Sequence, residues 1–141
     1  MFAPKKSKVE SQYPIAYKPK KVGKYPAFVK SGGGYFFDEV LEYRVWIHPE
    51  AGGEDLCDGD DYFYSFVTYE EALEFSKKTK GVEEPLVLIL QREHVDEPEP
   101  NKFIHIKGKH IAEWQVQWLE NSKRNKDSIP NFLKEHMADK N

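Results

Sequence analysis

Short runs of alternating or aromatic-rich hydrophobic residues predict strands along most of this chain. In the run 41–48 every second side chain is apolar, and a strand places these on one buried face: Tyr43, Val45 and Ile47. The intervening side chains then share the opposite face, which we expect to be exposed: Arg44, Trp46 and His48. Further strands are expected over 62–67, 85–90 and 102–106, and 111–119 is expected to form a strand or a short helix. The intervening Glu97–Pro100 is expected to be a rigid turn.

Two helices are predicted from their boundary signals. Thr68 is a suitable N-cap, and Glu71 three residues later completes a capping box. Lysines precede Gly81 at the other end, which favours a helix over 68–80. A terminal helix is expected over 129–137, because Asp127 or Ser128 is able to cap it and Pro130 suits its first turn.

These elements predict an α+β fold. We expect a small, bent or split, mostly antiparallel sheet of about five or six strands. One central helix packs on it and a C-terminal helix follows. Only one crossover helix is evident, which disfavours a repeated strand–helix–strand array.

The length and composition are those of one globular domain. The chain has 141 residues, of which 39% are hydrophobic, 32% charged and 14% aromatic. The aromatic residues supply enough apolar area for a modest core, so the chain as a whole is not expected to be disordered. We find no secretory signal and no run of about 20 apolar residues, and therefore expect a cytoplasmic protein without a membrane partner.

Charge is distributed unevenly along the chain. Residues 1–30 carry eight lysines and one glutamate, whereas residues 31–100 carry five basic and eighteen acidic residues. We therefore divide the chain into a basic, Pro/Lys-rich extended arm (1–33) and a single α+β domain (34–141). The arm has the charge to bind nucleic acid or an anionic surface. Its Tyr-Pro pairs favour extended backbone, and a solvated arm, or one docked on its own acidic domain, is the preferred interpretation.

Three other motifs lack the residues or the spacing that the chemistry they suggest would require. The glycines at 32–34 lack the following Lys-Ser/Thr of a phosphate-binding loop and are interpreted as a hinge. The acidic stretch 54–61 lacks the spacing of a calcium loop and is interpreted as a turn. Scattered histidines and the single Cys57 do not form a zinc set, so no metal is predicted.

The string from Tyr64 to Phe75, beginning Tyr-Ser-Phe-Val-Thr, resembles the strand-to-helix block of the ADP-ribosyltransferase-like superfamily. The resemblance implies an NAD-binding transferase. Within it, Arg44 or His48 takes the phosphate or ribose of NAD. Ser65 and Thr68 belong to the block that shapes the nicotinamide side.

The same resemblance implies a catalytic glutamate on a late strand, for which the chain has two candidates. Glu93 lies in Gln91-Arg92-Glu93, similar to the family's Gln-x-Glu turn, but comes early. Glu113 comes at a more typical distance and is slightly preferred. A carboxylate there stabilises the positive charge that develops on the ribose when the nicotinamide leaves.

Two alternatives stay open. Residues 34–46, with the stretch 58–62 and the pair Glu113-Trp114, look like small uncharacterised bacterial proteins that sometimes carry the label of GCN5-related acetyltransferases. The acetyl-CoA-binding loop of that family is not found here. The other alternative is a non-catalytic protein-interaction module that uses exposed tryptophans as anchors: Trp46, Trp114 and Trp118.

Overall fold

The computed structural model describes residues 11–27 and 34–138 and confirms the α+β class. Six strands form two antiparallel sheets: β1 (Glu39–Ile47), β2 (Tyr62–Phe66), β3 (Leu86–Gln91), β4 (His94–Glu99), β5 (Lys102–Ile106) and β6 (His110–Gln115). The helices are α1 (Tyr69–Lys78), α2 (Ser128–Ala138) and three short 3-10 turns: η2 (Pro19–Lys21), η3 (Pro49–Ala51) and η4 (Val116–Leu119).

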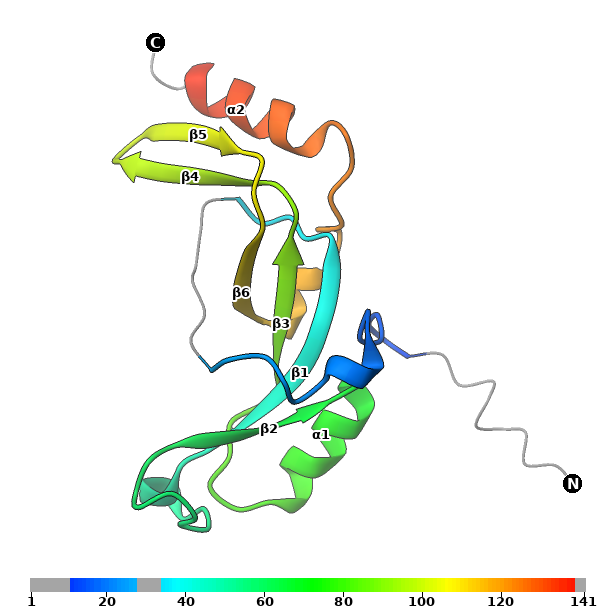
Figure 1. Cartoon of the computed structure of the whole chain (residues 1–141), viewed down its shortest axis with the longest axis vertical. Coiled ribbons are helices and arrows are strands. Elements are labelled where there is room, and N and C mark those ends of the chain that lie inside the picture. The colour runs from blue at the N-terminus through cyan, green and yellow to red at the C-terminus, as the bar shows by residue number, and fades with distance from the viewer. Residues whose placement is uncertain (1–10, 28–33, 139–141) are drawn as a thin grey trace, which may run out of the picture.

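The main sheet has four strands in the order β2-β1-β3-β6, and β4 and β5 form a separate pair. Since β3 continues into β4 and β5 into β6, these four strands are the arms of one long, bent hairpin (Figure 1). The predicted turn over Glu97–Pro100 is wrong, because β4 extends to Glu99. The reversal falls at Asn101, whose φ of 67° is a left-handed conformation that asparagine tolerates.

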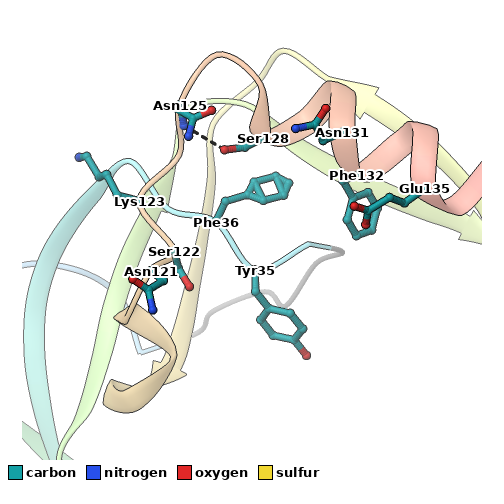
Figure 2. Close-up of a pocket in the computed structure, with 10 residues that line it drawn as sticks. All are labelled: Tyr35, Phe36, Asn121, Ser122, Lys123, Asn125, Ser128, Asn131, Phe132 and Glu135. Atoms are coloured by element: carbon teal, nitrogen blue, oxygen red, sulfur yellow. Dashed lines mark hydrogen bonds between the residues drawn. The ribbon is translucent and has the colours of Figure 1, made fainter.

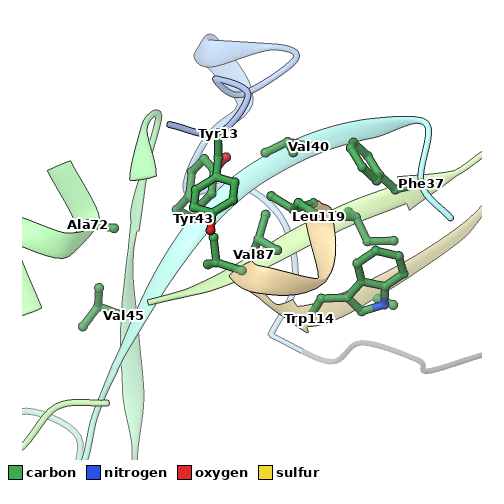
Figure 3. Packing of buried hydrophobic residues seen from close by; sticks show 12 residues of the cluster. Tyr13, Phe37, Val40, Tyr43, Val45, Ala72, Val87, Trp114 and Leu119 are labelled. Atoms are coloured by element: carbon green, nitrogen blue, oxygen red, sulfur yellow. The ribbon is translucent and has the colours of Figure 1, made fainter. Parts of the chain in front are cut away.

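The main sheet has two different faces. We call one the apolar face: Tyr43 and Val45 of β1, Val87 and Ile89 of β3, and Ala112 and Trp114 of β6 pack there into the main core (Figure 3). Ala72 of α1 and Leu119 of η4 cover it. We call the other the charged face: Glu42, Arg44 and Trp46 of β1, Phe63 and Ser65 of β2, and Glu113 of β6.

Both helices form where local signals predict them. Thr68 caps α1, since its side chain accepts a hydrogen bond from the Glu71 amide and the Glu71 side chain returns one to the Thr68 amide. Helix α2 packs across the β4–β5 pair, with Ile129 buried beside Phe36 and Val95 in a second, smaller core (Figure 1).

Residues 11–27, which we call the strap, pack against the body. Tyr13 and Ala16 are buried, and the Ala16 and Tyr17 amides donate to the carbonyls of Val67 and Val40 at 2.9 and 2.7 Å. The strap then crosses over β1 (Figure 1). On the charged face it reaches Glu42 and Arg44. Of the predicted arm, residues 1–10 and 28–33, including two of the three hinge glycines, lie outside the described residues. No helix among the described residues is long and apolar enough to cross a membrane.

Candidate functional site

The charged face centres on the guanidinium of Arg44. Its Nε donates to Glu42 Oε2 at 2.7 Å, its Nη1 to Glu113 Oε2 at 3.2 Å and its Nη2 to the Pro26 carbonyl at 2.7 Å. The guanidinium carbon lies 4.2 Å from the ring centre of Phe63, a cation–π distance. Residues of β1, β2, β6 and the strap therefore all contact the Arg44 side chain.

Both carboxylates have further donors. Glu42 accepts from the Ser65 hydroxyl at 2.8 Å and from the Gly23 amide at 2.8 Å. Glu113 accepts from the indole nitrogen of Trp46 at 3.0 Å. The only buried side-chain polar atom without a partner among the described residues is Glu70 Oε1, outside this network. The network is therefore hydrogen-bonded throughout, as buried charges require.

Burial of this network corrects one sequence-based expectation. Arg44 does lie opposite Tyr43 and Val45, but both it and Glu42 are 0% exposed, so the expected exposed face is wrong for Arg44. The strap supplies part of the cover, because Tyr25 packs beside the Leu41, Leu88 and Leu90 cluster on the same side. Nothing in the sequence near Arg44 indicates that cover.

The structure brings together three of the predicted site residues. Arg44 contacts Glu113 directly, and Ser65 is joined to Arg44 through Glu42. Glu42 itself was missed by the sequence reasoning, although its position two residues before Arg44 on one strand places it on the same face.

The other predicted site residues lie elsewhere. His48, beyond the end of β1, bridges Asp61, at 3.0 Å, and Glu83, and these hydrogen bonds raise the pKa of its imidazole. Thr68 is occupied as the cap of α1.

Glu93 lies at the bend of the long hairpin, away from the charged face. Its carboxylate is 2.7 Å from His105 Nε2 and 3.8 Å from Arg124 Nη1. The hydrogen bond from His105 is the main cause that lowers the pKa of Glu93. The structure therefore gives this glutamate an ion-pairing role at the bend.

A second candidate site is a pair of adjoining hollows that Tyr35 borders, and Figure 2 shows the one that lies beside α2. The volumes are about 280 and 390 Å³. The larger is lined by Tyr35, Trp118, Glu120 and Ser122. The smaller lies between the segment before β1 and α2, and its walls include Phe36, Phe132, Asn125 and Asn131. The Tyr35 and Trp118 rings are 5.1 Å apart and inclined by 71°.

The three tryptophans that were predicted to be exposed anchors differ in their exposure. Trp118 is 38% exposed, but Trp114 is 5% exposed and belongs to the core, so the expectation of an exposed Trp114 is wrong. Trp46 is half-buried and bonded to Glu113. Tyr35, 64% exposed, was missed, although an aromatic residue directly after a glycine run was a signal that it lies in an open segment.

No family model, curated protein or solved structure matches the chain. Within the described residues, no group of three or more His, Cys, Asp or Glu side chains is placed to hold a metal ion.

Proposed function

We propose that this protein is a non-catalytic interaction module that binds a proline-rich, basic peptide. The binding site is the corner that Tyr35 and Trp118 form at the larger hollow, which we call the notch. The observation that carries the proposal is this pair of exposed rings set nearly at right angles over a hollow of about 390 Å³. Tyrosine and tryptophan provide large contact areas with few rotatable bonds, which is why they dominate binding hot spots.

The inclination of the rings favours proline over a sugar. A sugar ring stacks on one flat aromatic face, whereas two rings in edge-to-face contact at 71° present an L-shaped corner, against which a pyrrolidine ring is able to pack. Proline-rich segments also adopt an extended helix before binding, so little conformational entropy is lost when they dock on aromatic grooves.

Polar groups beside the notch suit the rest of such a peptide. A polyproline helix leaves its carbonyls without internal partners, and the amides of Asn125 and Asn131 line the adjoining hollow. Glu120 borders the notch and supplies a negative charge for a lysine or arginine of the ligand.

The test is a titration of a fluorescein-labelled proline-rich peptide that contains one arginine, followed by anisotropy. We expect saturable binding that weakens about thirtyfold in Tyr35→Ala or Trp118→Ala, as for truncation of a hot-spot aromatic. Tyr64→Ala is the matched control, because Tyr64 is 44% exposed but packs on α1 through Phe75. This variant should bind like the wild type.

Two results would overturn the proposal. One is equal loss in all three variants, which would indicate non-specific binding to exposed aromatics. The other is binding of a linear oligosaccharide, sensitive to Trp118→Ala, with no peptide binding.

ADP-ribosyl transfer with NAD is the second candidate function, and one observation supports it. Arg44, Ser65 and Glu113, separated in sequence, meet in one network. In the described arrangement, however, Arg44 is fully paired and two carboxylates flank it, so the residues do not fit an anionic pyrophosphate unless the strap leaves.

Calorimetric titration of NAD into the wild type and Glu113→Gln tests this candidate. Heat that saturates for the wild type and is lost in the variant would support it, and a flat titration for both would contradict it.

A further inference from the structure

The two ends of the strap are held in different ways. At its beginning, Tyr13 packs in the main core, Ala16 is buried, and two backbone hydrogen bonds join it to Val67 and Val40. From residue 21 to 27 no side chain is fully buried, and only Val22 and Tyr25 are half-buried. Little apolar area therefore holds this second part, which lies on the charged face.

The second part is held mainly through its backbone. The Gly23 amide donates to Glu42 Oε1 at 2.8 Å, and Arg44 Nη2 donates to the Pro26 carbonyl at 2.7 Å. The donor lies in a turn in which Gly23 has a φ of +89°, and the acceptor follows three residues later, so the contact requires a turn followed by a short open segment. Tyr25 between them adds the one aromatic contact, beside the leucines of the charged face.

We propose that the charged face is a peptide-binding groove that residues 21–27 occupy as an internal ligand. Its external ligand is a basic peptide with a glycine turn before an aromatic-proline pair, the chemistry that the strap itself presents. Charge favours this class of ligand, because the groove presents two carboxylates against one guanidinium and the strap carries lysines at 18, 20, 21 and 24.

An external peptide is able to replace residues 21–27, because their departure leaves no polar group of Glu42 or Arg44 without a hydrogen-bond partner. Water is able to replace the Gly23 amide on Glu42 and the Pro26 carbonyl on Arg44, whereas the contacts of Arg44 with Glu42 and Glu113 remain. The anchored beginning of the strap stays in the core during this exchange, so the body keeps its Tyr13 packing.

Gly23 provides a way to bias the groove towards its open form. Its φ is +89°, which a residue with a Cβ adopts only at a cost, and a Cβ there would meet no atom within 4 Å. Gly23→Ala therefore weakens the docked strap without a clash. Gly59→Ala is the matched control, because Gly59 has φ +84° and the same open surroundings but lies in the turn before β2.

The experiment titrates a labelled peptide with the sequence of residues 19–27 into the full chain and follows anisotropy. We expect Gly23→Ala to bind it about tenfold more tightly than the wild type, since the internal competitor is weakened by the cost of the left-handed residue. Gly59→Ala should bind like the wild type. A peptide with alanine in place of its tyrosine should bind every variant more weakly.

Absence of saturable binding to folded Gly23→Ala, or equal binding to all three proteins, would overturn the proposal. Should Gly23→Ala fail to fold, Tyr25→Ala in the protein weakens the same part of the strap and carries the same expectation. Repeating the titration with Trp118→Ala tests whether the peptide binds at the charged face or at the notch. We expect the affinity of this variant to be unchanged, because the peptide binds at the charged face. This expectation holds whether or not the notch has a ligand.

Discussion

The two faces of the main sheet are built from the same strands and are both buried, yet they are held in different ways. On the apolar face, Tyr43, Val87 and Trp114 pack with residues of α1, η4 and the strap. On the charged face, Glu42 and Arg44 are equally inaccessible, but hydrogen bonds and ion pairs hold their charged groups in place. Burial alone therefore does not distinguish core from site in this protein.

The difference has an energetic consequence. Apolar packing is graded, because removal of a methyl group costs roughly the contacts of that group. A buried ion network is not graded, since loss of one member leaves the others charged and without compensation. The charged face should thus be more sensitive to single substitutions than its apolar counterpart.

Removal of the central guanidinium should have the largest effect. Arg44→Ala leaves Glu42 buried and Glu113 without its cation, and we expect the free energy of unfolding to fall by about 3–5 kcal/mol. Urea denaturation measures this. Arg92→Ala is the control, because its ion pair with Glu39 at 2.9 Å is partly exposed and should contribute about 0–1 kcal/mol. Equal losses in the two variants would contradict the contrast between the faces.

The next largest effect should come from the indole of Trp46. Trp46→Phe keeps a ring beside Phe63, 4.9 Å away between centres, but removes the donor to Glu113. We expect a loss of about 1.5–3 kcal/mol, typical of a hydrogen bond to a charged group. Trp118→Phe, at a more exposed tryptophan, should change the unfolding free energy by less than about 0.5 kcal/mol. An unchanged free energy of unfolding in Trp46→Phe would mean that water replaces the indole as the hydrogen-bond donor to Glu113.

Local signals in the sequence were enough to predict much of the fold. The capping box of α1 needs only Thr68 and Glu71, and the two faces of β1 follow from alternation. Burial of Arg44 was not predictable in this way. Its cover comes from Pro26, and its second carboxylate lies 69 positions later in the chain, so both depend on strand pairing and on the docked strap.

The candidate sites show the same limit. Glu113 and Trp114 are neighbours in sequence but lie on opposite faces of β6, and only the pairing with β3 decides which faces the charged network. The notch likewise joins Tyr35, before β1, to Trp118 in η4. Short motifs identified Arg44, Ser65 and Glu113, but they did not indicate whether these residues form an open site or a closed network.

The apolar face should respond mildly to a conservative change. Ile89 is fully buried there, and Ile89→Val removes one methylene while leaving the surrounding packing intact. The expected loss is about 0.5–1.5 kcal/mol in the same denaturation experiment. A loss as large as that of Arg44→Ala would show that the two faces do not differ in sensitivity.

The smallest effect should come from His48, which lies just beyond β1 where the carboxylates around it are about half exposed. Hydrogen bonds to Asp61 and Glu83 raise the pKa of His48, so the folded state binds its proton more tightly than the unfolded state does. This contribution is complete at a pH below about 6.5, the ordinary pKa of histidine, and is lost as the pH rises through the raised folded value. Thermal melting of the wild type and His48→Gln should therefore differ most near pH 5.5 and converge at about pH 8.5. A difference that stays constant over this range would mean that the imidazole stabilises the protein through packing, as a residue of the apolar face does, and not through its charge.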